Sequence, residues 1–360
     1  MDFALSEDQR EIARSAREFL AERYPIESVR SAALELDAGD PCTPEQWREA
    51  SELGWLGLAV PEADSGLGLG TVELVVLHEA LGYALAPLPI WSATAALLLV
   101  AASGTNDQRE TYLPALAEGE LRAVQTESAQ TELRLDANGL SGFALGVPDG
   151  IGADLLVVPH DGGTLVLRSD ATGVDIRPIA SLDPSRRLAE ITFMNAAVEP
   201  LGEADIAAPD RARKAIAAAL AAESVGVASF ALDSAVAYAK EREQFGRPIG
   251  AYQAVSHVCA QMYRDVENAR SAVLYAAWTV DHAPTDAPLA IAMATSCALE
   301  VGYTAPEAAL QIFGGIGFSW EHHLHLWLKR GRSNAALGGG SRAARARVAE
   351  LIGVARLREA

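Results

Sequence analysis

The stretch Arg242-Glu243-Gln244-Phe245-Gly246 separates two long helical patterns, residues 213–240 and 251–280. In the second pattern, apolar residues recur at helical spacing and form one stripe, which is typical of a helix that packs against other helices. Residues 289–313 and 341–357 show comparable patterns. Four such helices predict a helical bundle in the C-terminal part of the chain.

Upstream of this bundle the sequence changes character at about Leu121. Residues 6–119 follow the helical period and begin with a capping box, Ser6 with Gln9. From there to about Gly202, β-branched alternation and intervening turns predict short strands in a small antiparallel barrel or sandwich. The predicted fold class is therefore α+β, mainly α, with an N-terminal α-helical domain (residues 1–120), a central β domain (121–204) and a C-terminal four-helix bundle (205–360).

The composition argues against several classes of function. Of 360 residues, 29 are basic and 48 acidic, which gives a formal charge of −19. A chain this acidic has no general attraction for nucleic acid or anionic membranes, so an anionic ligand must be held by a local basic cluster. Three cysteines without CxxC spacing argue against a disulfide framework and against a cysteine zinc site. We expect a cytoplasmic protein.

We expect neither a secretory signal nor an integral membrane segment. The chain opens directly into a charged stretch, residues 6–23. The most apolar run, residues 90–102, is shorter than the roughly 20 residues that span a bilayer. This run is interpreted as a buried helix.

Two short segments carry candidate ligand-binding residues. In the first, the guanidinium of Arg242, the amide of Gln244 and the ring of Phe245 could together hold a pyrophosphate and stack on an adenine. The alternative is a helix–loop–helix with solvated charges and Phe245 in the core. In the second, Gln311 precedes Gly314 and Gly315, so that a polar side chain and bare backbone could approach a ligand.

The alternative for this second segment is a tight helix C-cap. Three histidines follow it, His322, His323 and His325, but no carboxylate or cysteine stands at a familiar ligand spacing. We therefore expect no metal site.

Together these segments resemble the acyl-CoA dehydrogenase family. The resemblance extends over nearly the whole chain, through residues 3–22 (FALSEDQREIARSAREFLAE), 53–70 (LGWLGLAVPEADSGLGLG), 247–257 (RPIGAYQAVSH) and 311–318 (QIFGGIGF). It implies three domains in the order above, an oligomer, and FAD bound across a subunit interface. It also implies α,β-desaturation of an acyl-CoA, with an electron-transferring flavoprotein as the expected acceptor. In the family pattern, the residues that match Arg242, Phe245, Gln311, Gly314 and Gly315 hold the pyrophosphate and adenosine half of a neighbouring subunit's FAD.

The sequence departs from the family pattern at the catalytic base. Family members abstract the α proton of the thioester with a glutamate. The resemblance places one known position of this glutamate at Gly338 and the other near Ile216, and neither is a carboxylate. The segments that cover the flavin ring in the family match residues 124–131 and 143–150, which are shortened and contain no tryptophan. The chain's own isoalloxazine pocket is therefore expected to be degraded.

These losses resemble the short subunit of the heteromeric acyl-CoA dehydrogenases that actinobacteria use for steroid side chains. A longer dehydrogenase subunit would then supply the glutamate, and the alternative assembly is a homodimer or homotetramer. One alternative function is a self-sufficient dehydrogenase whose base is Glu223, two turns after Ile216 on roughly the same helix face. A flavin-dependent monooxygenase or oxidase and a non-catalytic scaffold subunit are further hypotheses for the same fold. Substrate-binding residues and the acyl chain are left open.

Overall fold

The computed structural model describes residues 4–34, 42–127, 130–202, 207–320 and 322–354. The chain forms two compact units that interleave along the sequence. We call them the helical unit (Met1–Leu34, Val75–Ala86 and Ala217–Ala360) and the sandwich unit (Glu35–Leu74 and Pro87–Ile216). The division into three domains at residues 120 and 204 stays a prediction.

The sandwich unit contains two four-stranded sheets, with strand orders β1-β4-β5-β8 and β2-β3-β7-β6. Two of its helices begin with capping boxes, Thr43 with Gln46 and Thr105 with Gln108. The elements are α3 (Pro44–Glu52), η1 (Glu62–Asp64), α5 (Ile90–Ser103), α6 (Asn106–Ala117), β1 (Ala123–Gln125), β2 (Gln130–Asp136), β3 (Gly139–Pro148), β4 (Leu155–His160), β5 (Gly163–Arg168), β6 (Val174–Ile179), β7 (Leu188–Ala196) and β8 (Glu199–Pro200).

Strand alternation divides the apolar residues between two cores. Val124 and Leu156 face a core shared with Ile191 and Phe193 of the other sheet, whereas Ala123 and Leu155 belong to a core with helices α5 and α6. The β region is therefore a sandwich, one of the two predicted forms. One pairing departs from the predicted antiparallel pattern, because β1 runs parallel to β4. The complete β2–β3 hairpin between them makes this crossover possible.

The helical unit is built around α7, which starts at Ala207 and reaches Glu241. Glycines allow very close helix contacts: a Cβ on Gly226 would lie 2.0 Å from the Glu79 carbonyl oxygen, and one on Gly331 would lie 1.9 Å from that of Gly302. The elements are α1 (Glu7–Arg23), α2 (Ile26–Leu34), α4 (Thr71–Ala84), α7 (Ala207–Glu241), β9 (Glu243–Gln244), β10 (Arg247–Pro248), η2 (Ile249–Ala251), α8 (Gln253–His282), α9 (Ala287–Phe313), η3 (Gly314–Phe318), α10 (Leu324–Leu337) and α11 (Ser341–Leu351); α4 and α7 also continue into the sandwich unit.

One helix among the described residues passes the length and hydropathy test for a membrane span. It is Ala208–Glu241, and 89% of its most apolar window is buried inside the protein. Such burial is typical of the core helix of a bundle.

Candidate functional site

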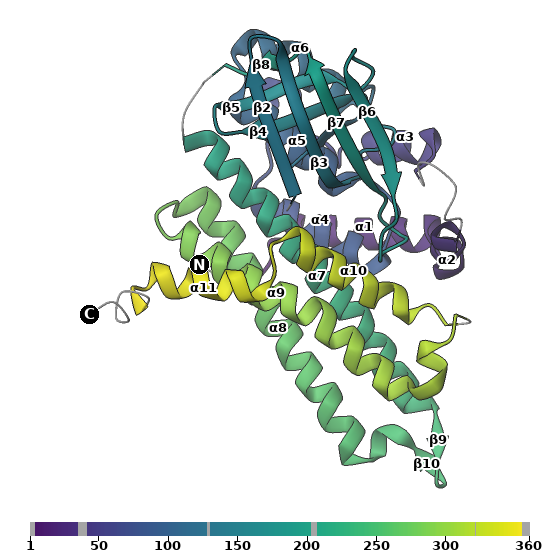
Figure 1. Cartoon of the computed structure of the whole chain (residues 1–360). Coiled ribbons are helices and arrows are strands. Elements are labelled where there is room, and N and C mark those ends of the chain that lie inside the picture. The colour runs from purple at the N-terminus through teal and green to yellow at the C-terminus, as the bar shows by residue number, and fades with distance from the viewer. Residues whose placement is uncertain (1–3, 35–41, 128–129, 203–206, 321, 355–360) are drawn as a thin grey trace. The chain divides into compact units, whose positions relative to one another are not determined.

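The Arg242–Gly246 stretch forms the tip of a β-hairpin at one end of the bundle (Figure 1). Strands β9 and β10 pair Gln244 with Arg247, which leaves Phe245 and Gly246 as a two-residue turn with φ angles of 53° and 80°. Positive φ at both turn residues is the geometry that matches the twist of a hairpin. The turn leaves Phe245 94% exposed. The alternative that placed Phe245 in the core is therefore wrong.

The hairpin backbone is fixed while its ligand-binding candidates stay exposed. The amide of Ile249 donates to the Arg242 carbonyl oxygen over 2.8 Å, and the hydroxyl of Tyr252 donates to that of Gln244 over 3.1 Å. The guanidinium of Arg247 lies 4.0 Å from the centre of the Tyr252 ring. In the part of the chain that the structure describes, the exposed Arg242 side chain has no ion-pair partner.

The second predicted segment ends helix α9 and begins η3. Gly314 has φ 66° and ψ −142°, a conformation that is essentially restricted to glycine, so it is the C-cap that the alternative predicted. Gly315 has no such backbone requirement, and a Cβ built on it meets no described atom within 4 Å. The side chain of Gln311 is exposed beside them. Gly315 therefore has no reason within the described chain to lack a side chain.

The two segments meet at the same end of the bundle. Tyr238, in the last turn of α7, stacks on Phe313, the last residue of α9, with ring centres 4.2 Å apart and planes 14° apart. This contact joins the helix that leads into the hairpin to the helix that leads into the glycine loop. The structure thus places the two predicted cofactor-binding segments at the same end of the bundle, whereas their role stays a prediction.

The position that the resemblance assigned to the base is closed by apolar side chains. Gly338 is the C-cap of α10, and its amide donates to the Asn334 carbonyl oxygen over 2.9 Å. A Cβ at this position would lie 2.7 Å from Leu299 Cδ1 and 3.4 Å from Leu220 Cδ2. Leu299 is fully buried. A side chain at residue 338 would therefore enter packed hydrophobic surroundings.

The alternative base, Glu223, lies in a buried ion pair. Its side chain is 3% exposed and its Oε1 accepts from Arg330 Nη1 over 2.9 Å. Asn334 Nδ2 lies 3.4 Å from the same oxygen, and Asn334 is also fully buried. The contacts connect α7 to α10, where Arg330 lies two turns and Asn334 one turn before Gly338. At the other family position, the Ile216 carbonyl oxygen accepts from Trp91 Nε1 over 3.3 Å.

Of the segments expected to cover the flavin ring, one lies in a β-sheet, with a register shift between Leu145 and Val147. Residues 143–148 belong to β3 and pair with β7, and Asp149 follows with φ 58° and accepts a hydrogen bond from Ser92 Oγ. In the other segment, Ser128 and Ala129 lie outside the described residues. The hydroxyl of Thr126, just after β1, is fully buried and has no hydrogen-bond partner among the described residues.

The three histidines lie in an aromatic cluster. His323 stacks against His322 with ring centres 4.3 Å apart and contacts the edges of Phe230 and Trp327. Burial lowers the pKa of His323 and of His325 to about 4. No group of three histidine, cysteine, aspartate or glutamate side chains in the described residues is arranged to hold a metal ion.

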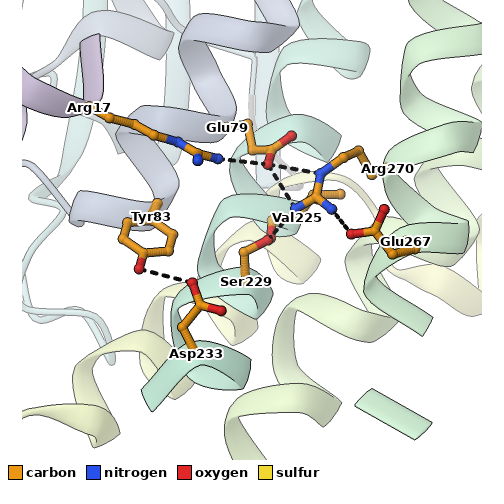
Figure 2. Close-up of polar contacts among 8 residues, drawn as sticks. All are labelled: Arg17, Glu79, Tyr83, Val225, Ser229, Asp233, Glu267 and Arg270. Atoms are coloured by element: carbon orange, nitrogen blue, oxygen red, sulfur yellow. Dashed lines mark hydrogen bonds and ion pairs between the residues drawn. The ribbon is translucent and has the colours of Figure 1, made fainter. Parts of the chain in front are cut away.

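One polar cluster escaped sequence reasoning, because its members come from distant parts of the chain (Figure 2). The Glu79 carboxylate lies 2.9 Å from Arg270 Nη2 and 3.5 Å from Arg17 Nη2. Arg270 also donates to Ser229 Oγ over 2.8 Å and pairs with Glu267. These residues join α1, α4, α7 and α8. No local pattern around Glu79 signals partners 62 and 191 residues away.

A second contact in the same region joins Tyr83 of α4 to Asp233 of α7. The Tyr83 hydroxyl donates to Asp233 Oδ2 over 3.0 Å. Burial, followed by the negative charge of Asp233, raises the pKa of Tyr83 to about 12. The phenol therefore stays a hydrogen-bond donor at neutral pH.

Comparison with known proteins agrees with the predicted resemblance. The family profile described as "Acyl-CoA dehydrogenase, N-terminal domain" matches residues 6–120, and "Acyl-CoA dehydrogenase, C-terminal domain" matches residues 215–353. Acyl-CoA dehydrogenase IpdE2 of Mycobacterium tuberculosis (strain ATCC 25618 / H37Rv) is 33% identical over 335 residues, which cover 92% of this chain and 93% of IpdE2. Acyl-CoA dehydrogenase FadE34 of the same strain is 34% identical over 290 residues, 80% of this chain but only 39% of the length of FadE34.

Solved structures show the same likeness. A variant of the Tcur3481-Tcur3483 steroid ACAD has a TM-score of 0.87 and 30% identity, and the match covers 98% of this chain and 99% of that chain. The ChsE4-ChsE5 complex from Mycobacterium tuberculosis also has a TM-score of 0.87, and at 24% identity it shows the fold alone. The predicted fold class is thereby confirmed. The chain belongs to the acyl-CoA dehydrogenase family, whose members are FAD-dependent oxidoreductases, as its sequence segments predicted.

Proposed function

We propose that this chain is the subunit of a heteromeric acyl-CoA dehydrogenase that completes the FAD site of a longer partner subunit. The complex would desaturate an acyl-CoA thioester between its α and β carbons. In this proposal the partner supplies the glutamate base, and this chain supplies the residues that hold the adenosine and pyrophosphate half of FAD.

The observation that carries the proposal is the set of unpaired groups at the end of the bundle. Phe245 is 94% exposed on a hairpin whose backbone is hydrogen-bonded, so the described chain does not bury this apolar ring. Arg242 presents an exposed guanidinium, and Gly315 presents backbone with no described atom within 4 Å of a Cβ built on it. A guanidinium suits a pyrophosphate, and an exposed ring suits an adenine.

These residues fit the adenosine and pyrophosphate half of FAD. Arg242 and Gln311 would bind phosphate and hydroxyl oxygens, Gly314 and Gly315 would let the loop backbone approach them, and Phe245 would stack on the base, with the Gln244 amide at its side. When bound, FAD supplies the electron acceptor for the desaturation. The contribution of this chain is to bind and orient it.

The base position supports the division of labour between two subunits. Gly338 has no carboxylate, and the space above it is filled by Leu299. Glu223, the alternative carboxylate, is committed to Arg330 in a buried pair. We therefore assign Glu223 a structural role. A structure with 30% sequence identity is named the Tcur3481-Tcur3483 steroid ACAD, a name that contains two proteins and the word steroid. On that basis a steroid-type acyl-CoA is the proposed substrate.

Production of the chain with and without a longer family member tests this proposal. We expect the purified chain alone to show little visible flavin absorbance and no dehydrogenation of acyl-CoA with an electron-transferring flavoprotein. Co-production should restore both. The partner produced alone is the control, since it should lack full flavin occupancy. A yellow, active homodimer or homotetramer of this chain would contradict the proposal.

The Glu223 alternative has its own test in the same complex. Glu223→Gln should leave the turnover per bound flavin within a few fold if the residue is structural. Loss of a general base would instead lower turnover by roughly 10²-fold or more. Protein stability must be followed in parallel, because the substitution also disturbs the pair with Arg330.

A further inference from the structure

A cavity of about 510 Å³ lies within the helical unit, bounded by α1, the start of α2, α4, α7 and α10. Its size falls in the range of about 300–1,000 Å³ that is usual for small-molecule sites. Apart from four aromatic residues and one arginine, the described residues that line it are aliphatic. The described residues that line it belong to neither the hairpin nor the glycine loop of the proposed FAD site.

Four aromatic side chains form much of the cavity wall: Tyr24, Tyr83, Phe230 and Trp327. Phe230 and Trp327 stack with ring centres 3.7 Å apart and planes 11° apart, and Tyr83 contacts Phe230 edge-on at 5.5 Å. The polar atoms of two rings are already bonded, since Trp327 Nε1 donates to the Tyr83 carbonyl oxygen over 3.0 Å and the Tyr83 hydroxyl donates to Asp233. The wall is thus pre-formed and presents apolar surface to the cavity.

Among the described residues that line this apolar space, one carries a positive charge. Arg17 has a side chain that is 53% exposed, and its guanidinium lies 5.6 Å from the centre of the Tyr83 ring. Figure 2 shows this guanidinium directed toward Glu79, at 3.5 Å. Glu79 has a second and closer cation, Arg270, at 2.9 Å. Arg17 can therefore exchange Glu79 for another anion without leaving the Glu79 carboxylate unpaired.

We propose that this cavity binds a small apolar carboxylate, with its hydrocarbon part against the aromatic wall and its carboxylate on Arg17. A guanidinium pairs with a carboxylate through two parallel hydrogen bonds, which gives the ligand its orientation. The charge of Arg17 suits a monoanion. It does not suit a CoA thioester, whose several phosphate charges would need more basic residues. The ligand is a free acid, and its site is separate from the residues assigned to FAD.

A pair of probes of nearly equal shape tests the charge requirement: naphthylacetate and its neutral amide, naphthylacetamide. We expect isothermal titration calorimetry on the full-length chain to show at least about tenfold tighter binding of the carboxylate, the scale of one charge-assisted hydrogen bond. Arg17→Met should remove this difference and leave the affinity for the amide unchanged. Arg14→Met is the matched control, because Arg14 lies on the same helix and pairs with Glu11.

A second variant tests the location. Ala84 lines the cavity, and Ala84→Phe should fill it and weaken binding of both probes by about tenfold or more. Circular dichroism confirms that each variant is folded. If Ala84→Phe does not fold, the Arg17→Met comparison still decides, since that side chain is half exposed. Equal affinity for the two probes, no binding of either, or an unchanged preference in Arg17→Met would overturn the proposal. None of these readouts depends on flavin or turnover.

Discussion

Two regions of the helical unit differ in how their candidate site residues are packed: one leaves them exposed, and the other buries them. At the hairpin and the glycine loop, Arg242 and Phe245 are exposed, and no described atom lies within 4 Å of a Cβ built on Gly315. At the α10 C-cap, Glu223 and Arg330 are paired and buried, and Leu299 covers Gly338. Exposed groups held on a fixed backbone fit the proposal that another molecule completes this surface. Filled space indicates a position that the chain uses for its own stability.

The packing around Gly338 bears on the absence of a glutamate at this position. A catalytic carboxylate that is replaced by glycine could leave a hollow, which a substitution would refill. Here Leu299 Cδ1 stands 2.7 Å from the position of the missing Cβ, and the ion-paired Arg330 lies two turns earlier on α10. Restoring a carboxylate at residue 338 would require the Leu299 side chain to move. The packing around Gly338 is consistent with the proposal that a partner subunit carries the base.

The largest expected effect comes from a substitution in the buried ion pair of α7 and α10. Arg330→Met removes the ion-pair partner of the buried Glu223 and should lower the free energy of unfolding by about 3–5 kcal/mol, the usual cost of stranding a buried charge. Urea denaturation followed by circular dichroism measures it. The double variant Glu223→Met, Arg330→Met should recover most of this loss, because neither charge then remains. A loss below about 1 kcal/mol in the single variant would mean that the pair is solvated.

The next largest effect comes from a substitution on the exposed hairpin. In the complex with the partner, Arg242→Ala should weaken flavin binding by about 10–100-fold, as expected for the loss of a hydrogen bond to a charged group. Unfolding of this chain should change by no more than about 0.5 kcal/mol, because the side chain is exposed and unpaired within the described residues. Flavin retained after gel filtration is the measurement. Arg134→Ala, an exposed arginine on β2, is the control, and unchanged flavin content in Arg242→Ala would refute the assigned role.

Features that depend on residues close together in the sequence could be predicted, whereas features that depend on distant residues could not. The capping box at Ser6, the bundle helices and the sandwich strands depend on residues close in sequence, so their patterns are readable. The candidate ligand-binding segments are likewise short and continuous in sequence, and their role stays a prediction. The exposure of Phe245 depends on the turn geometry, and the closure of Gly338 depends on Leu299, 39 residues earlier in the numbering. The Glu79 cluster depends on still longer-range contacts, which no local pattern encodes.

Substitutions at two neighbouring glycines distinguish a glycine required by backbone conformation from one required for the approach of a ligand. Gly314→Ala places a side chain at φ 66° and ψ −142°, and should lower the unfolding free energy by about 1–3 kcal/mol. Gly315→Ala should change it by no more than about 0.5 kcal/mol, because no described atom lies within 4 Å of the new methyl group. The same substitution should nevertheless weaken flavin binding severalfold in the complex. If Gly315→Ala retains flavin fully, the loop backbone does not approach the cofactor.

The smallest effect concerns His323, in the segment that joins the two regions. Burial, assisted by the charge of His322, lowers the pKa of His323 from 6.5 to about 4, so the folded protein binds this proton less readily than the unfolded chain. The contribution to stability is complete above about pH 6.5 and is lost as the pH falls toward 4. His323→Phe keeps an aromatic ring against Phe230 and Trp327 but removes the titration. We expect it to reduce the loss of unfolding free energy between these pH values by about 1 kcal/mol, a figure that allows for partial exposure of the ring. His257→Phe, on an exposed position of α8, controls for the removal of a histidine, and an unchanged slope in His323→Phe would show that the aromatic cluster opens to water.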